Sequence, residues 1–344
     1  MSKVTIVAEI GCNHNGDVNL AKELIEEAAK AGVDAVKFQT FVAEELVSCY
    51  APKAEYQKKD NADESQLDMI RKLELSKDEY IEAKEYAESL GLEWFSTGFD
   101  MTSIDFLNSL DQKVWKIPSG EITNLPYLER IRDIRCSNKW IILSTGMSTL
   151  DEIHFAVSVL EKSDNTKFTI LHCNTEYPTN DNDMNLSAME VLKEEFPGWE
   201  VGLSDHSEGI IASITAIGMG ATFIEKHFTL DKNLPGPDHR ASITPDELKA
   251  LCDGIHRAEM MIGSKEKIVT NSERKNKIVA RKSIVASCNI SKGEELTPDN
   301  LSCKRPGNGI SPIHWYDVIG TKAIRDFQPD ELIEANGIGW EGHT

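Results

Sequence analysis

The chain has 344 residues and a formal net charge of -20 at pH 7, which argues against a nucleic-acid or anionic-membrane partner. Its length allows one large domain with a sizeable core and a second, smaller domain. The seven cysteines form no CxxC pair, no stretch is long and apolar enough to span a membrane, and the first residues are too polar for a signal peptide. We therefore expect a protein of the reducing cytoplasm.

Strand-like and helical patterns alternate over about 260 residues, a length typical of a barrel of parallel strands. The predicted strands are residues 4–10, 33–38, 92–95, 113–117, 140–143, 168–171, 201–203 and 221–224. A first helix is predicted between a cap at Asp17 and a stop at Gly32, Ser148 is expected to cap a middle helix, and a capping box at Thr244 and Glu247 opens the last one. Eight such units predict an α/β fold, a (β/α)8 TIM barrel. An open doubly wound sheet is disfavoured because no GxGxxG follows the first strand.

Two segments lie outside this alternation. The connection at residues 40–76 is long for a compact domain, which is typical of a lid or binding loop. After Gly263, the charged and lysine-rich residues 264–282 predict a linker behind a catalytic barrel of residues 1–263. Residues 283–344 combine short strand patterns with dense glycine and proline, so we expect a small domain of marginal stability that docks on a barrel.

A histidine follows each of the last two predicted barrel strands. His206 comes after the strand at 201–203, and His227 after the strand at 221–224. Neighbouring strands of a parallel sheet lie about 4.8 Å apart, so the two imidazoles could bind one divalent metal ion. Either histidine alone would be read as an ordinary surface residue, and it is their matched placement that favours a metal site.

Polar side chains occur at the carboxyl end of nearly every predicted strand, where barrels place their catalytic groups. Lys37 and Lys116, with Ser119, Ser144 and Ser204, form a plausible cradle for a phosphate or carboxylate within an acidic protein. Further strand-end groups are Gln39, Thr97, Tyr177 and Glu225, and the candidates for general acid and base work are Glu9 and Glu121. The alternative is that polar groups simply cover the ends of buried strands. For Asp238 and Arg305, the sequence allows either a turn residue or a ligand-binding group.

The chain resembles the sialic acid synthase family, and several segments are most similar to bacterial N-acetylneuraminate synthases. The segments that carry the resemblance are AEIGCNHNG (8–16), VKFQTF (36–41), KIPSGE (116–121), ILSTGM (142–147), LHCNTEYPT (171–179), GLSDHS (202–207), EKHFT (225–229), GPDH (236–239) and KRPGNGISP (304–312). The C-terminal part resembles the antifreeze-protein-like (SAF, β-clip) domain of these enzymes, which binds sugar. One departure is Gly98, where the family commonly has proline.

The resemblance implies condensation of phosphoenolpyruvate with N-acetylmannosamine and water, giving N-acetylneuraminate and, by carbon–oxygen cleavage, phosphate. It implies that His206 and His227 bind a divalent ion, manganese before magnesium or cobalt, which polarises the sugar aldehyde. Phosphoenolpyruvate would be held by Lys37, Thr97, Lys116, Ser119, Ser144 and Ser204, and the sugar hydroxyls would meet Tyr177 and Asp238. Gln39 would be a further substrate-binding residue. Glu9 would handle the water or the cationic centre, and Glu121 the new alkoxide or the sugar. Arg305 would reach the N-acyl group from the partner subunit of a domain-swapped homodimer.

Three alternatives stay open at this point. A related synthase could use another N-acylated hexose and make a legionaminate or pseudaminate. A non-catalytic carbohydrate-binding or antifreeze-like protein is suggested only by the last segment, and it leaves the lysines and histidines unexplained. A barrel aldolase with a lysine Schiff base, or a metal-dependent hydrolase, would also use strand-end residues.

Overall fold

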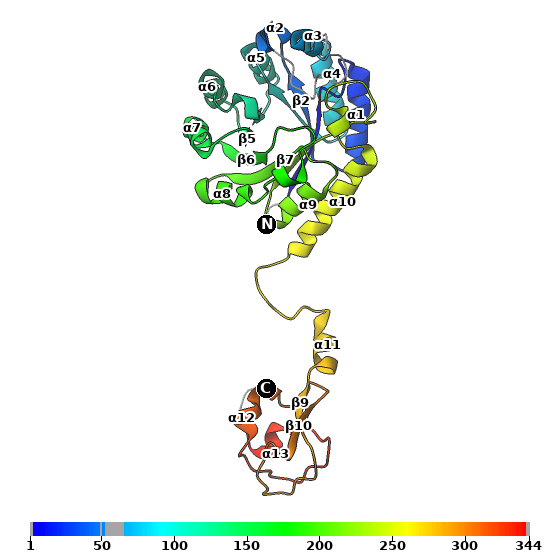
Figure 1. Ribbon diagram of the computed structural model, residues 1–344, viewed down its shortest axis with the longest axis vertical. Coiled ribbons are helices and arrows are strands. Elements are labelled where there is room, and N and C mark those ends of the chain that lie inside the picture. The colour runs from blue at the N-terminus through cyan, green and yellow to red at the C-terminus, as the bar shows by residue number, and fades with distance from the viewer. Residues whose placement is uncertain (1–2, 49, 52–64, 342–344) are drawn as a thin grey trace. The chain divides into compact units, whose positions relative to one another are not determined.

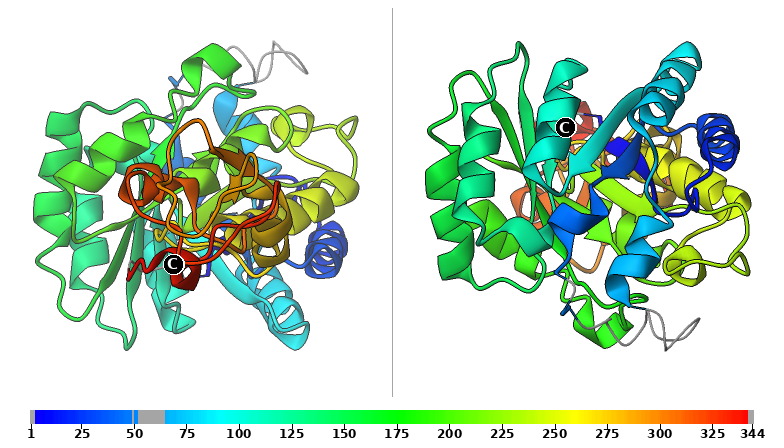
Figure 2. Two further views of the ribbon diagram at one scale, coloured as in Figure 1. Left: turned by 90° about the horizontal axis from the view of Figure 1, so that it is seen from below. Right: turned by 90° about the horizontal axis from the view of Figure 1, so that it is seen from above.

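The computed structural model describes residues 3–48, 50–51 and 65–341. It separates into two compact units, Met1–Gly263 and Ser264–Thr344. The first unit is a parallel eight-stranded sheet that curves into a barrel, with helices around the outside of the strands (Figure 1, Figure 2), which confirms the α/β barrel-like fold expected from the alternation. Within the described ranges, no helix combines the length and apolarity needed to cross a membrane.

The strands and helices of the first unit follow the predicted order closely. The strands are β1 Thr5–Gly11, β2 Ala35–Thr40, β3 Glu93–Gly98, β4 Val114–Ile117, β5 Trp140–Ser144, β6 Lys167–Cys173, β7 Glu200–Asp205 and β8 Phe223–His227. The helices are α1 Val18–Ala31, α2 Ala43–Leu46, α3 Gln66–Arg71, α4 Lys77–Ser89, α5 Met101–Ser109, α6 Leu125–Asp133, α7 Leu150–Leu160, α8 Ala188–Glu195, α9 Ile211–Gly218 and α10 Pro245–Ile262. Short 3-10 turns at Ser119–Glu121, Asp181–Asp183 and His239–Ala241 lie between them.

Local capping explains where several of these helices begin and end. Asp17 accepts a hydrogen bond from the Asn19 N–H at the start of α1, and Gly32 ends that helix with a φ of 92°. The capping box predicted at Thr244 opens α10. The expected cap at Ser148 is wrong by one residue, because Thr149 forms a complete capping box with Glu152.

The strand order β3-β2-β1-β8-β7-β6-β5-β4 leaves β3 and β4 at its two ends, in contact with each other. A side chain bridges this seam. The buried Gln112, just before β4, accepts from the Ser96 N–H at 2.8 Å and donates to the Ser96 carbonyl at 2.9 Å. The Gln112 amide thereby supplies the donor and acceptor that a strand backbone would have offered, and it satisfies backbone groups of β3 that are buried.

Side chains alternate along each strand between the helices and the barrel interior, and the interior is layered. Its lower layer is a hydrophobic cluster with members on seven strands: Val7, Ala35, Phe95, Val114, Ile142, Leu171 and Phe223. Because side chains repeat every two residues along a strand, the next inward layer consists of the residues two positions further on. That upper layer is polar: Glu9, Lys37, Thr97, Lys116, Ser144, Cys173 and Glu225. A packed hydrocarbon floor thus supports a ring of reactive groups.

The second unit has its own small core. Its strands β9 Ser283–Ala286 and β10 Leu301–Lys304 pair antiparallel, and its short helices are α12 Trp315–Val318 and α13 Ala335–Ile338. Its core includes Ile284, Leu296 and Phe327. The segment expected to be a linker contains helix α11 Glu273–Ala280, because a run of helix-forming residues follows Thr270, whose N–H donates to the Glu273 carboxylate.

The barrel interior has no room for an additional methyl group at Gly202 on β7. A Cβ there would lie 2.5 Å from the Phe223 carbonyl oxygen and 2.7 Å from Leu171 Cδ2. We expect Gly202→Ala to destabilise the first unit by about 1–3 kcal/mol and to lower its thermal midpoint. Gly198→Ala is the matched control, because a Cβ at Gly198 meets no atom within 4 Å. Equal midpoints for the two variants would contradict this packing.

His14 lies in the turn after β1 and is buried against Phe38 with ring centroids 5.8 Å apart, and burial lowers its pKa to about 4. As pH falls below 6.5, the His14 imidazole takes up a proton in the unfolded chain but not in the folded protein. His14 therefore lowers the free energy of unfolding by up to about 3 kcal/mol between pH 6.5 and pH 4. We expect His14→Gln to flatten the pH dependence of urea unfolding over that range. An unchanged pH dependence of unfolding in this variant would contradict the account.

Candidate active site

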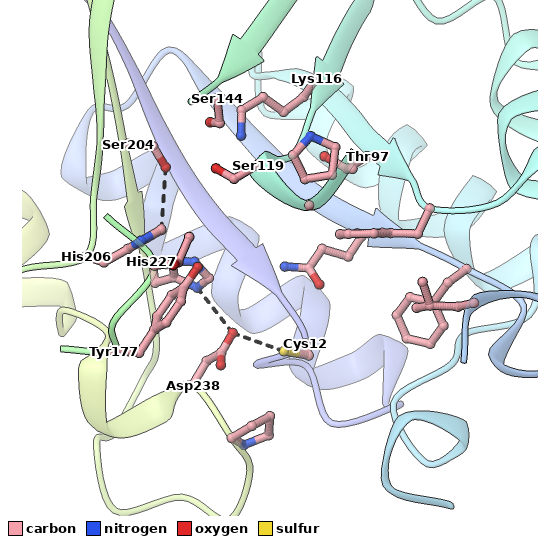
Figure 3. A pocket seen from close by; sticks show the side chains of 18 of the residues that line it. Cys12, Thr97, Lys116, Ser119, Ser144, Tyr177, Ser204, His206, His227 and Asp238 are labelled. Atoms are coloured by element: carbon pink, nitrogen blue, oxygen red, sulfur yellow. Dashed lines mark hydrogen bonds and ion pairs between the residues drawn. The ribbon is translucent and has the colours of Figure 1, made fainter. Parts of the chain in front are cut away.

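A cavity of about 490 Å³ opens at the carboxyl ends of the barrel strands, within the range of roughly 300–1,000 Å³ usual for small-molecule sites. Its polar lining is Lys37, Gln39, Gln66, Thr97, Lys116, Ser119, Ser144, Thr175, Tyr177, Ser204, His206, Glu225, His227 and Asp238. Figure 3 shows Lys116, Ser119, Ser144 and Thr97 on one side of this space, with His206, His227, Tyr177 and Asp238 on another. The structure therefore brings together all but three of the predicted site residues.

Four buried charges form the base of the site. Lys37 Nζ lies 2.5 Å from Glu9 Oε2 and 3.9 Å from Glu225 Oε1, and Lys116 Nζ lies 3.2 Å from the same Glu225 oxygen. All four side chains are nearly inaccessible to water. Two ammonium groups and two carboxylates balance in charge, which removes much of the cost of burying them.

The surroundings shift the pKa values of the two carboxylic acids, Glu225 and Glu9, in opposite directions. Burial opposes ionisation of Glu225, but Lys116 and Lys37 outweigh it and lower the pKa of Glu225 to about 2. Burial raises the pKa of Glu9 despite its contact with Lys37. Burial also lowers the pKa of Lys116. Glu225 is therefore a fixed negative charge, whereas Glu9 is the carboxyl better able to carry a proton, and such a divergence is typical of catalytic pairs.

Hydroxyl groups surround the lysines, and two of them have no hydrogen-bond partner in the described part of the chain. Ser204 Oγ donates to Glu225 Oε1 at 3.1 Å, and Ser119 Oγ accepts from the Gly146 N–H at 2.9 Å. Thr97 Oγ1 and Ser144 Oγ are buried without a hydrogen-bond partner among the described residues. Unsatisfied buried donors are costly, so their position beside two ammonium groups favours a bound anion with several oxygen atoms.

The two histidines predicted to share a metal ion do lie together. Their ring centroids are 5.2 Å apart, and the Tyr177 ring stacks on His206 at 4.1 Å (Figure 3). His206 Nδ1 hydrogen-bonds the Asn174 carbonyl, so Nδ1 carries the proton and Nε2 keeps its lone pair. Burial lowers the pKa of His227, which keeps that imidazole neutral and able to act as a ligand.

These two residues fit a divalent ion. Their ring centroids are 5.2 Å apart, near enough for both imidazoles to bind the same ion. Asp238 Oδ2 lies 3.4 Å from His227 Nδ1 and can orient that ring. No group of three or more histidine, cysteine or carboxylate residues suited to a metal occurs in the part of the chain described. The remaining ligands would therefore come from water or substrate.

Three predicted residues are not among those that line the cavity. Glu9 is beneath the cavity rather than on its lining, behind Lys37. Glu121 does not line the cavity either, and its carboxylate accepts a hydrogen bond from Asn124 Nδ2 at 2.6 Å. Arg305 belongs to the second unit, where its Nε donates to the Ala280 carbonyl at 3.1 Å. The chemical roles expected for these residues stay predictions.

The strand-end pattern gave Glu225 no specific chemical role and gave no reason to place Cys12 or Cys173 in the site. The structure places all three on the cavity lining, with Cys12 Sγ donating to Asp238 Oδ2 at 3.2 Å. The signal for Glu225 was available, because it precedes His227 by two residues on one strand and so shares its face. Seven residues from the 40–76 connection also line the cavity, which supports the expected binding loop: Phe41, Leu46, Val47, Gln66, Met69, Ile70 and Leu73. Residues 49 and 52–64 of that connection lie outside the described part.

Known proteins resemble this chain over almost its full length. It is 50% identical over 336 residues to an N,N'-diacetyllegionaminic acid synthase of Campylobacter jejuni, covering 97% of this chain and 99% of that protein. It is 33% identical to the human N-acetylneuraminate-9-phosphate synthase, covering 95% and 90% of the two chains. A crystal structure of an N-acetylneuraminic acid synthetase from Leptospira borgpetersenii, in complex with citrate, matches with a TM-score of 0.70 and 34% identity over 80% of this chain and 90% of that one.

Two family models match the two units in turn. The NeuB family model covers residues 24–267, and the SAF domain model covers residues 281–338. These matches agree with a barrel whose mouth carries paired lysines, hydroxyls and imidazoles, and with a small C-terminal unit built on β9 and β10. The chain therefore belongs to the NeuB family and ends in a SAF domain.

Proposed function

We propose that this protein condenses phosphoenolpyruvate with a six-carbon sugar that carries two acetamido groups, together with water, to give N,N'-diacetyllegionaminate and phosphate. The observation that carries the reaction type is the buried lysine and hydroxyl cluster beside the two imidazoles. The acceptor differs from the N-acetylmannosamine first expected. The 50% identity to a diacetyllegionaminate synthase, against 33% to a neuraminate-phosphate synthase, favours the alternative acceptor.

Phosphoenolpyruvate fits the cationic side of the cavity. Lys37 and Lys116 would neutralise its carboxylate and phosphate, and the unpartnered hydroxyls of Thr97 and Ser144 would donate to its oxygens. The Ser119 and Ser204 hydroxyls lie in the same lining. Binding of the anion would therefore satisfy donors that the free protein leaves buried.

The bonds balance with one water consumed. The methylene carbon of phosphoenolpyruvate attacks the aldehyde carbon, and the aldehyde oxygen gains a proton. Water then adds to the cationic central carbon, and the tetrahedral intermediate loses phosphate through carbon–oxygen cleavage. We propose that the Glu225 carboxylate stabilises the positive charge from the cavity wall. Glu9, which lies behind Lys37, would take up the proton that the water releases by way of the Lys37 ammonium, which passes one proton to Glu9 and accepts one from the water. Since Glu121 is outside the lining, Glu225 is the better candidate near the reacting atoms.

His206, through Nε2, and His227 would hold a divalent ion, with manganese the expected metal. When bound, this ion supplies Lewis-acid polarisation of the sugar aldehyde. The protein's own part is to orient both imidazoles, through the Asn174 carbonyl for His206 and Asp238 for His227, while burial keeps His227 neutral. Tyr177, stacked on His206, would cover the sugar from the side.

The remaining proposals concern the assembly. We propose a homodimer in the cytoplasm in which Arg305 of the SAF domain binds the N-acyl group of a sugar in the partner's barrel. An exposed arginine beside a glycine-rich loop supports this proposal.

Removal of divalent metal should abolish turnover. We expect EDTA treatment to stop phosphate release from phosphoenolpyruvate and the diacetamido sugar, and added manganese to restore it, because the aldehyde loses its Lewis acid. His206→Gln and His227→Gln should lose at least about 100-fold in kcat/KM, as metal-ligand changes commonly do. The surface variant His154→Gln should match the wild type. Full activity after thorough chelation would rule out the metal role.

Replacing Glu225 with glutamine should separate binding from chemistry. Glu225→Gln keeps the size of the side chain but removes the negative charge beside both lysines. We expect the KM for phosphoenolpyruvate to fall, because the cradle becomes more positive, and kcat to drop by about 100-fold or more. Glu121→Gln is the matched comparison in steady-state kinetics. Loss of kcat in Glu121→Gln but not in Glu225→Gln would reverse the assignment.

A further inference from the structure

One wall of the cavity is hydrocarbon rather than polar. A separate hydrophobic cluster, distinct from the two barrel cores, consists of Cys12, Phe41 and Leu73 with the half-buried Leu46, Ile70 and Phe99 packed against them. All six of these residues line the cavity. We call this set the apolar wall. The polar chemistry proposed above uses none of its side chains.

The apolar wall is a built surface anchored to the barrel. The Val42 N–H donates to Asp100 Oδ2 at 2.7 Å, and the Ala43 N–H donates to Glu74 Oε2 at 3.1 Å, which satisfies the backbone at the start of α2. Arg71 NH2 of α3 lies 2.7 Å from Glu44 Oε1 of α2. These bonds hold the two short helices together, and the described residues suffice to form the wall.

The apolar wall adjoins the place where the sugar would react. Cys12 Sγ contacts Asp238 Oδ2, and the same oxygen lies 3.4 Å from His227 Nδ1 (Figure 3). Phe99 follows Thr97 by two residues at the end of β3, so the wall also borders the anion cradle. A six-carbon sugar with its aldehyde beside the imidazoles would therefore present its far carbons to hydrocarbon.

Contact with hydrocarbon is unfavourable for a sugar hydroxyl, because the hydroxyl loses its hydrogen bonds to water and gains none in return. The same contact is favourable for the methyl of an acetamido group or for a deoxygenated carbon. Gln66, also on the cavity lining at the start of α3, offers an amide that can pair with the polar part of an acetamido group. The wall thus matches a sugar with a second acylamino group better than it matches N-acetylmannosamine.

We propose that the apolar wall is the specificity element for the acceptor, recognising the methyl-bearing second acetamido group of the sugar and disfavouring a hydroxyl in its place. This inference rests on the proposed function and deepens it, because it assigns substrate choice to the α2–α3 segment. The polar ring of the barrel mouth would perform the same chemistry on either acceptor.

The test compares two acceptors across matched variants of the manganese-loaded full chain. Phosphate release at saturating phosphoenolpyruvate gives kcat/KM for the six-carbon diacetamido sugar and for N-acetylmannosamine. We expect the wild type to prefer the diacetamido sugar by about 10- to 100-fold, the range that an apolar pocket can reach. Ile70→Asn and Leu46→Asn should each reduce that preference at least several-fold. The control Ile211→Asn changes an exposed residue of α9 and should keep the preference.

The outcomes separate the two proposals. No phosphate release with any acceptor would overturn the proposed reaction, and calorimetric binding of the two sugars would then still report on the wall. The specificity role would be overturned if the wild type had the same kcat/KM for both sugars. It would also be overturned if the wall variants lowered kcat/KM by the same factor for both sugars. An unchanged KM for phosphoenolpyruvate shows that a variant is folded. Because two wall positions are tested separately, the comparison can still be made if one of the two variants does not fold.

Discussion

The mutual neutralisation of four buried charges underlies the whole active site. Glu9, Lys37, Glu225 and Lys116 occupy the mouth of a barrel where water is nearly excluded. None of these groups could be ionised there alone, since an unpaired buried charge costs several kcal/mol or more, but pairing makes the set tolerable. The pairing also fixes their roles, since Glu225 shares its charge with both lysines and Glu9 with one.

The barrel makes this arrangement possible by its layering. Hydrophobic side chains from seven strands fill the floor, and the polar ring begins two residues later on each strand. The tight approach of Phe223 to Gly202 shows how little free space the floor has. A floor of this kind holds the polar side chains in place, so Thr97 and Ser144 keep their buried hydroxyls unpaired in readiness for a ligand.

Reaction and selectivity come from different parts of the chain. The groups for the chemistry stand on barrel strands, which also hold the fold together. Four of the six residues of the apolar wall lie in the segment between β2 and α4 that carries the short helices α2 and α3, and the other two, Cys12 and Phe99, follow β1 and β3. Such a division lets a family keep one reaction while its acceptor changes, because loops on a rigid scaffold tolerate variation that strands do not.

The barrel, the two ends of its first helix and the proximity of His206 to His227 could be predicted from the sequence, because periodicity, caps and parallel-strand order are local or follow from topology. The same reasoning placed Lys37, Lys116 and the serines at one end of the strands. Long-range packing put Glu225 rather than Glu121 on the cavity lining, buried His14, and assembled the apolar wall from the α2–α3 segment, Cys12 and Phe99. Those facts depend on which surfaces face one another across the cavity, and such contacts between distant residues leave no periodic trace in the chain.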